Sequence, residues 1–193
     1  MPLIILDRDG VINKDSDDFI KSPQEFIPLP GSLEAIARLN AAGYCVTVAT
    51  NQSGIARGLF DLQTLDAMHH KLEKLLTAIG GHLEGIFYCP HAPDAGCDCR
   101  KPKPGLLQQI SHRLKTELGG VPVIGDSLRD LQSAQAVGAA PILVRTGKGE
   151  RSLAQLAKEP GLANVPVFDD LAAAVDALLT GKLTGKTSDQ QVL

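Results

Sequence analysis

Two aspartates stand one residue apart where an apolar run near the start of the chain reaches a glycine. Residues 3–6 are apolar, and Asp7, Arg8, Asp9 and Gly10 follow them. A run this short, closed by Asp-Gly, favours a buried strand of a parallel sheet over a helix. Because strand residues alternate between faces, we expect Asp7 and Asp9 on one side and Arg8 turned away from both. Taken alone, the same residues also suit an ordinary polar turn.

Three later segments, each at or beyond the end of an apolar run, carry polar residues of a matching kind. They are Thr50 with Asn51, Arg100 with Lys101, and Asp126 with Asp130. Carboxylates hold a hard divalent cation, hydroxyl and N–H groups grip phosphate oxygens, and a cation offsets the charge of a transferring phosphoryl group. An aspartate can also attack phosphorus and form an acyl phosphate. Together these residues predict one site for phosphoryl transfer.

A second group of residues has the types and spacing of metal ligands. Three of the four cysteines crowd with one histidine into a single segment, as Cys89, His91, Cys97 and Cys99. In a reducing compartment such crowding indicates a metal before a disulfide, and a full Cys₃His set is typical of structural zinc. The alternative is a chance cluster of free thiols. His69, His70, His82 and His112 have no such partners at ligand spacing, so we interpret each as a surface or partly buried packing residue.

The elements that must position these residues alternate along the chain. Apolar runs predict strands at 3–6, 45–49, 83–88, 121–124, 142–144 and 165–168. Helical spacing of apolar residues predicts helices that begin near 32 and 128 and others at 61–79, 104–118, 152–158 and 171–179. Such alternation predicts an α/β fold with a doubly wound, mostly parallel sheet and helices on both faces.

Length and composition limit the remaining possibilities. The 193 residues suit one domain, which we place at 1–180, followed by a flexible tail at 181–193. The net charge of −3, with 4% aromatic residues, disfavours a nucleic-acid partner. The chain start does not resemble a signal peptide, and no apolar stretch approaches the roughly 20 residues that span a bilayer. We therefore expect a cytoplasmic protein with no membrane partner.

The polar groups described above resemble, in order, the four motifs of the haloacid dehalogenase (HAD) superfamily. The motifs are Asp7-x-Asp9-Gly10-Val11, Thr50-Asn51, Lys101-Pro102-x-Pro104-Gly105 and Gly125-Asp126-x-x-x-Asp130. They cover most of the chain. The resemblance implies a HAD-like Rossmannoid phosphatase in which Asp7 becomes phosphorylated while Asp9 protonates the leaving alkoxide and later deprotonates water.

The same resemblance implies roles for the other residues of the site. Thr50 would bind the phosphate and Lys101 would neutralise it, and Mg²⁺ would be held by Asp7, the backbone carbonyl of Asp9, and Asp126. The substrate would be positioned by Asn51, Gln52, Ser53 and Arg100, with the loop residues Asp15, Ser16, Asp17 and Asp18. Lys103 also precedes a proline and is interpreted as a rim charge. Asp130 either orients the magnesium shell or starts a helix.

Within the superfamily, three groups of enzymes come into question. The segments 50–58, 89–102 and 144–147 resemble the D-glycero-D-manno-heptose 1,7-bisphosphate 7-phosphatases, which serve lipopolysaccharide synthesis. The histidinol-phosphate phosphatases share Asp-Arg-Asp-Gly and the zinc loop, and the short gap between His91 and Cys97 is closer to theirs. Residues 53–58 and 145–147, however, favour the heptose enzymes, which we therefore take as the predicted group. A polynucleotide 3′-phosphatase would need a basic track, and none is evident in the sequence. We expect a monomer that hydrolyses a small sugar phosphate, without a cap domain, because a loop and a helix already use the connection after the first strand.

Overall fold

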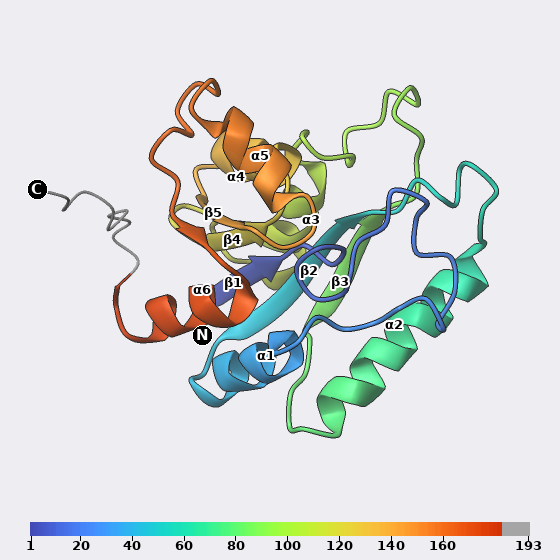
Figure 1. The fold of residues 1–193 in the computed structure, drawn as a ribbon, viewed down its shortest axis with the longest axis horizontal. Helices are drawn as coiled ribbons and strands as arrows, with labels where there is room; N and C mark the ends of the chain where they lie inside the picture. The colour runs from blue at the N-terminus through green and yellow to red at the C-terminus, as the bar shows by residue number, and fades with distance from the viewer. Residues whose placement is uncertain (183–193) are drawn as a thin grey trace, which may run out of the picture.

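Six parallel strands form the sheet of the computed structural model, which describes residues 1–182 (Figure 1). The strands are β1 (Leu3–Leu6), β2 (Cys45–Asn51), β3 (Gly85–Cys89), β4 (Pro122–Gly125), β5 (Ala140–Val144) and β6 (Val167–Phe168). Each pair of neighbouring strands is parallel. The predicted doubly wound α/β sheet is therefore confirmed.

The strand order places β1 at the centre of the sheet. From edge to edge the order is β3-β2-β1-β4-β5-β6, so chain progression runs one way from β1 to β3 and the other way from β4 to β6. Leu3 of β1 lies opposite Cys45 of β2, and Ile5 lies opposite Val123 of β4. Ligands of open α/β sheets bind at such a reversal, beyond the carboxyl ends of the strands. Asp7 follows β1 directly and therefore lies at that point.

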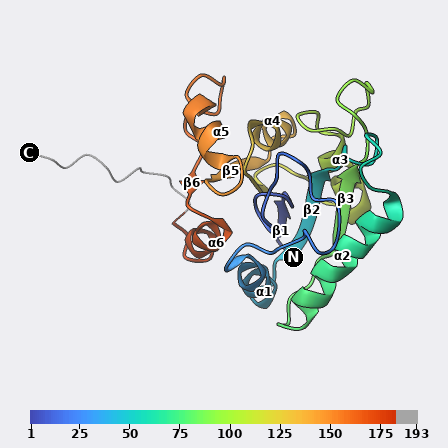
Figure 2. The ribbon, with the colours of Figure 1, turned by 45° about the vertical axis from the view of Figure 1, so that its right-hand side comes forward.

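Helices cover both faces of the sheet (Figure 2). They are α1 (Ser32–Ala41), α2 (Leu62–Thr77), α3 (Gly105–Leu114), α4 (Leu128–Ala136), α5 (Gly149–Leu156) and α6 (Leu171–Leu179). The apolar sides of α1, α2 and α6 pack with Ile4 and Leu6 into one core, and those of α3 and α4 pack with Leu3 and Ile5 into another. Because alternate residues of β1 enter opposite cores, this strand is buried along its whole length.

The ends of the elements follow local chemistry that the sequence shows only in part. Asp61 begins α2 by accepting a hydrogen bond from the backbone N–H of Thr64, as the polar residue before the helical pattern predicts. Helix α3 ends at Leu114, four residues before the predicted end, because Lys115 adopts a left-handed conformation with φ +51°. Helix α5 begins three residues earlier than predicted, at Gly149.

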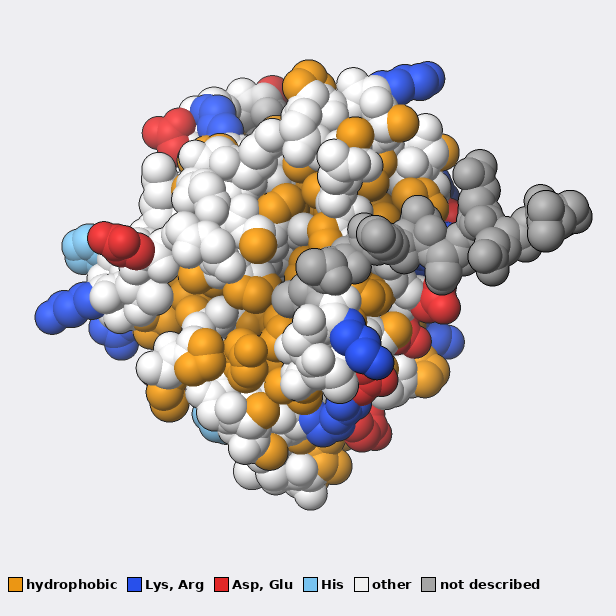
Figure 3. All heavy atoms as spheres, turned by 90° about the vertical axis from the view of Figure 1, so that its left-hand side faces the viewer, with side chains coloured by type: hydrophobic (Ala, Val, Ile, Leu, Met, Phe, Trp, Pro, Cys, Tyr) orange, Lys and Arg blue, Asp and Glu red, His pale blue; other side chains and the backbone are white. Residues whose placement is uncertain are grey.

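The face from which the strands begin is largely apolar at its centre. Figure 3 shows hydrophobic side chains gathered there, with most of the charged ones towards the margin. A shallow hollow on the starts of β4, β5 and β6 is lined by residues that include Pro122, Pro141 and Pro166. The polar residues of the HAD-like motifs lie at the opposite ends of the strands.

Two predictions concern the chain as a whole. The predicted tail falls mostly in residues 183–193, which lie outside the described residues, so the division at residue 180 stays a prediction. Within residues 1–182, no helix is both long enough and apolar enough to cross a bilayer.

Candidate active site

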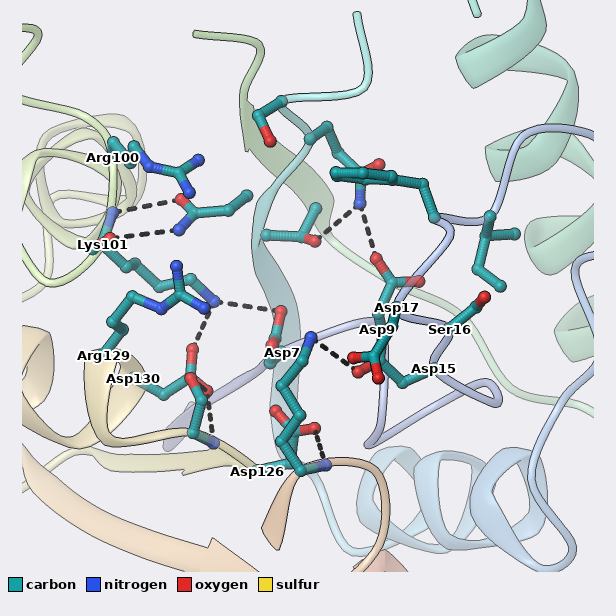
Figure 4. Close-up of a pocket in the computed structure, with 18 of the residues that line it drawn as sticks. Asp7, Asp9, Asp15, Ser16, Asp17, Arg100, Lys101, Asp126, Arg129 and Asp130 are labelled. Atoms are coloured by element: carbon teal, nitrogen blue, oxygen red, sulfur yellow. Dashed lines mark hydrogen bonds and ion pairs between the residues drawn. The ribbon is translucent and has the colours of Figure 1, made fainter. Parts of the chain in front are cut away.

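A polar cavity of about 340 Å³ lies at the carboxyl ends of the strands (Figure 4). Most of the predicted site residues line it, namely Asp7, Asp9, Asp15, Ser16, Asp17, Thr50, Asn51, Gln52, Ser53, Arg100, Lys101, Asp126 and Asp130. Segments that are far apart in the sequence thus meet in one place, as the positions at the strand ends predict.

Three carboxylates and one ammonium group form the floor of this cavity. Oxygens of Asp7, Asp126 and Asp130 all lie within 4.8 Å of one another. The buried Nζ of Lys101 lies 3.0 Å from Asp7 and 2.5 Å from Asp130. Burial and the charge of Asp130 raise the pKa of Asp7 to about 7, while Lys101 opposes the rise. Burial and the charge of Asp7 raise the pKa of Asp126 to about 8. When all three carboxyl groups are ionised, they carry more negative charge than Lys101 offsets, which fits a divalent cation.

Asp130 serves two of its neighbours at once. One oxygen accepts hydrogen bonds from the backbone N–H and the hydroxyl of Ser127, and the Asp130–Ser127 pair forms the capping box of α4. The other oxygen accepts from Lys101. Lys103, in contrast, is half exposed and pairs with Asp98 on the surface. Lys101 is thus the motif lysine that enters the site, and Asp130 both starts a helix and braces that lysine.

Two glycines allow the backbone to approach Asp126. Gly10 has φ +84°, and a Cβ atom there would lie 2.0 Å from Oδ2 of Asp126. A Cβ atom at Gly147 would lie 2.1 Å from the same oxygen. That oxygen also accepts a hydrogen bond of 2.7 Å from the backbone N–H of Lys148. The glycines are therefore needed for the close packing that fixes the Asp126 carboxylate.

The environment of Asp9 differs from the predicted one. The Arg8 guanidinium does not turn away but binds both oxygens of Asp9, at 2.9 and 3.0 Å from Nη2. The prediction was wrong because β1 ends at Leu6 and the following turn abandons strand alternation. Asn13 and Gln52 also donate to Asp9. Burial alone would raise the pKa of Asp9, but the charge of Arg8 and these hydrogen bonds lower it below its ordinary value.

The amides at the end of β2 hold other site residues in place. Asn51 donates to the backbone carbonyl of Lys101 and accepts from its N–H, both at 3.1 Å. Gln52 donates from Nε2 to Asp9 and to the buried hydroxyl of Thr50, both at 2.9 Å. These contacts tie the ends of β1 and β2 and the Lys101 loop to one another.

The loop after β1 is fastened to the start of α5. Asp15 lies 2.7 Å from Nζ of Lys148, and Asp17 lies 3.1 Å from Nη2 of Arg151. The predicted loop residue Asp18 is exposed and is not among the residues that line the cavity. Its backbone N–H instead donates to the hydroxyl of Ser16 within the loop.

Sequence reasoning missed several basic residues of the cavity wall. Arg57, Arg129 and Lys148 line the cavity together with the predicted Arg100. Burial and the charges of Arg129 and Arg57 lower the pKa of Arg100. The sequence could have indicated these residues, because each lies in or beside a segment that carries the family resemblance. Arg57 lies within residues 50–58, Arg129 precedes Asp130, and Lys148 follows residues 144–147.

The Cys/His cluster lies beside this wall. The ligand atoms of Cys89, His91, Cys97 and Cys99 are all within 4.8 Å of one another, and the three thiols are free. The sulfurs of Cys89 and Cys99 are 3.1 Å apart, and Nδ1 of His91 is 3.3 Å from that of Cys99. Four soft and borderline donors around one point fit a tetrahedral zinc ion. Arg100 follows Cys99 directly, so the order of this loop determines where that cation lies.

Family models and curated relatives match nearly the whole described chain. Residues 3–127 match the model described as polynucleotide kinase 3 phosphatase, and residues 98–174 match the HAD-hydrolase-like model. The D-glycero-beta-D-manno-heptose-1,7-bisphosphate 7-phosphatase of Pseudomonas aeruginosa is 57% identical over 177 residues, which are 92% of this chain and 97% of that protein. The enzyme of the same name from Bordetella bronchiseptica is 56% identical over 179 residues, with 93% and 98% covered.

Two solved structures share this fold at high identity. One is the D,D-heptose 1,7-bisphosphate phosphatase of B. bronchiseptica complexed with magnesium and phosphate, with a TM-score of 0.89, 56% identity, and 94% and 99% of the two chains covered. The other is the D,D-heptose 1,7-bisphosphate phosphatase of Burkholderia thailandensis, with a TM-score of 0.72, 45% identity, and 93% and 99% covered.

Proposed function

The chain belongs to the D-glycero-beta-D-manno-heptose-1,7-bisphosphate 7-phosphatase family of HAD-like hydrolases, and we propose that it removes the 7-phosphate of that sugar bisphosphate. The observation that carries the proposal is the division of the cavity into an acidic floor with one lysine and a wall with three arginines. The floor suits the reacting phosphate and its metal ion. The wall suits a second anionic group.

In the proposed first step, a carboxylate oxygen of Asp7 attacks phosphorus and the bond from phosphorus to the sugar oxygen breaks. Asp9 is ionised in the free protein, so in this step it takes up a proton when the substrate binds and passes it to the departing alkoxide, while Lys101 and Thr50 bind the phosphoryl oxygens. In the second step, Asp9 takes a proton from water, the water oxygen attacks phosphorus, and inorganic phosphate leaves Asp7 free. Each step moves one proton through Asp9, so the rates of both steps depend on the position of its carboxylate.

A magnesium ion would be held by Asp7, Asp126 and the backbone carbonyl of Asp9. When bound, it would offset the negative charge of the phosphoryl group and of the carboxylates. Burial and neighbouring carboxylates raise the pKa values of Asp7 and Asp126, and a bound cation would oppose both effects, which supports this assignment. The magnesium and phosphate of the B. bronchiseptica structure are a further support.

The arginines of the wall favour a bisphosphate over histidinol phosphate. Among the described residues, no carboxylate forms an ion pair with Arg57, Arg100 or Arg129, whereas Lys148 and Arg151 are paired. Free guanidinium groups bind phosphate well and repel a cationic amine such as that of histidinol. We therefore assign the 1-phosphate to this wall, on the β anomer that the relatives' names specify.

The Cys/His cluster is assigned to a structural Zn²⁺ that orders the loop carrying Arg100. Specificity would then come from loops around residues 13–22, 52–58 and 89–100 rather than from a cap domain. The cytoplasmic location and the monomeric state stay predictions.

Steady-state kinetics with matched esters test this function. We expect kcat/KM to be highest for the β-heptose 1,7-bisphosphate, lower for the heptose 7-phosphate, and lower still for histidinol phosphate and a 3′-phosphorylated oligonucleotide. Arg129→Gln should lower kcat/KM for the bisphosphate by about tenfold and leave that for the 7-phosphate nearly unchanged. Faster turnover of histidinol phosphate, or an equal loss with both sugar esters, contradicts the assignment.

A further inference from the structure

A fully buried arginine lies directly behind the Asp9 carboxylate. Arg8 is 0% exposed, and its Nε and Nη2 donate to Oδ1 of Asp9 at 3.1 and 2.9 Å. Its Cζ lies 5.6 Å from the centre of the buried Phe26 ring. Asn13 adds a third hydrogen bond to Oδ1. Oδ1 thus accepts three hydrogen bonds, whereas Oδ2 accepts two, from Nη2 of Arg8 and from Nε2 of Gln52 on the cavity side.

The remaining side of the guanidinium meets a histidine from the long helix α2. Nη1 of Arg8 lies 3.2 Å from Nε2 of His69, which is 8% exposed. An arginine can only donate, so Nε2 of His69 must be the acceptor and the ring must be neutral. Burial and the charge of Arg8 lower the pKa of His69 to about 4, in agreement with a neutral ring. The proposed reaction does not use this buried imidazole.

We propose that His69 and Arg8 are positioning residues, which hold the Asp9 carboxylate so that Oδ2 can exchange protons with the leaving group and with water. This inference rests on the proposed function, in which Asp9 is the acid and base. His69 fixes the guanidinium by accepting from Nη1, and the guanidinium fixes Oδ1. Without an acceptor at position 69, Arg8 keeps its charge and its contacts with Asp9 and Phe26 but loses the hydrogen bond that fixes Nη1. The Asp9 carboxylate then loses its fixed orientation.

The choice of leaving group separates this role from a merely structural one. The first-step proton is needed for a sugar alkoxide but not for p-nitrophenolate, which leaves without protonation. The ratio kcat/KM reports phosphorylation of the enzyme for both esters. For His69→Leu we expect kcat/KM to fall about tenfold or more with the heptose bisphosphate, and less than about threefold with p-nitrophenyl phosphate.

Three further variants complete the test. His69→Gln keeps an acceptor for Arg8 and should restore most of the activity, and His70→Leu changes an exposed histidine of the same helix and should change neither ratio. Arg8→Lys keeps the charge without the two-pronged contact and should show the same selective loss as His69→Leu, even if the latter folds poorly. Equal losses with both esters, or unchanged kinetics in His69→Leu and Arg8→Lys, would overturn the inference.

Asp9→Asn distinguishes a failure of this inference from a failure of the proposed function. If Asp9→Asn loses activity on the sugar ester selectively and the His69 and Arg8 variants do not, the positioning role alone is wrong. If Asp9→Asn shows no selectivity between the two esters, its role as the acid is wrong, and the positioning role is overturned with it.

Discussion

Asp126→Asn is expected to stabilise the magnesium-free protein, and to do so more strongly as the pH rises. In the unfolded chain this carboxyl ionises near its ordinary pKa of 3.8, whereas in the folded protein burial and the charge of Asp7 raise its pKa to about 8. Between these values the folded state holds a proton that the unfolded state has released. Stability is therefore lost as the pH rises from about 4 to about 8, and the loss is complete above the folded pKa.

The size of the effect follows from the same values. From about pH 5 to about pH 8 the folded wild-type protein keeps this proton, whereas the unfolded chain has released it. Over these roughly three pH units wild type loses about 4 kcal/mol of its free energy of unfolding, and the loss is complete at about pH 9. The amide of Asn carries no charge, and its oxygen can still accept from the N–H of Lys148. The gain of the variant over wild type should thus grow by about 4 kcal/mol, or on the order of 10 °C in Tm. Titration of His69 affects both proteins and cancels in the comparison.

Thermal unfolding at about pH 5 and about pH 9, in magnesium-free buffer without a chelator, measures this difference and leaves the Cys/His cluster undisturbed. Added Mg²⁺ should stabilise wild type at the higher pH and have little effect on Asp126→Asn, because the ion loses a ligand. A variant that is no more stable than wild type at the higher pH, or a difference that does not depend on pH, refutes the reasoning.

Three other substitutions test separate parts of the site. Lys101→Met removes the cation from the acidic floor and should lower kcat/KM by about 10²-fold or more in steady-state assays; a loss below about tenfold contradicts its role. Cys97→Ala should release zinc, so metal analysis that finds unchanged zinc content counts against the cluster. Gly10→Ala should lower the free energy of unfolding by about 2 kcal/mol or more, measured with denaturant, because φ is +84° and the new Cβ meets Asp126. Gly58→Ala is the matched control, because Gly58 has φ +69° but no atom lies where its Cβ would be, so this variant measures the cost of the backbone conformation alone. An equal loss of free energy of unfolding in both variants would contradict the predicted clash with Asp126.

The sheet and the place of the site were predictable because both follow from short-range patterns. Apolar runs that end in Asp, Thr or Gly mark the carboxyl ends of buried parallel strands, and these ends must meet at one edge. Asp7, Thr50 and Asp126 come from three such ends, and the structure brings them to one cavity. Helix limits were less predictable, since a single left-handed residue, Lys115, ends α3 before its apolar pattern stops.

Long-range partners could not be predicted in this way. Strand alternation gave the wrong direction for Arg8, because alternation holds only while the strand lasts and the chain turns after Leu6. His69 could be interpreted only as a surface or partly buried packing residue, and no pattern within α2 indicates that its imidazole contacts Arg8. Likewise, nothing in the sequence shows that the Asn51 side-chain amide forms two hydrogen bonds with the backbone of Lys101.

The central claim is that Asp7 itself becomes phosphorylated. Mixing the magnesium-loaded enzyme with the β-heptose 1,7-bisphosphate, quenching in acid during turnover and reducing with borohydride converts a phosphorylated aspartate into homoserine. The account predicts homoserine at position 7 in wild type, and none in Asp7→Asn, which should be folded and inactive. Turnover in which Asp7 stays unmodified while another residue is reduced, or a fully active Asp7→Asn variant, would contradict it.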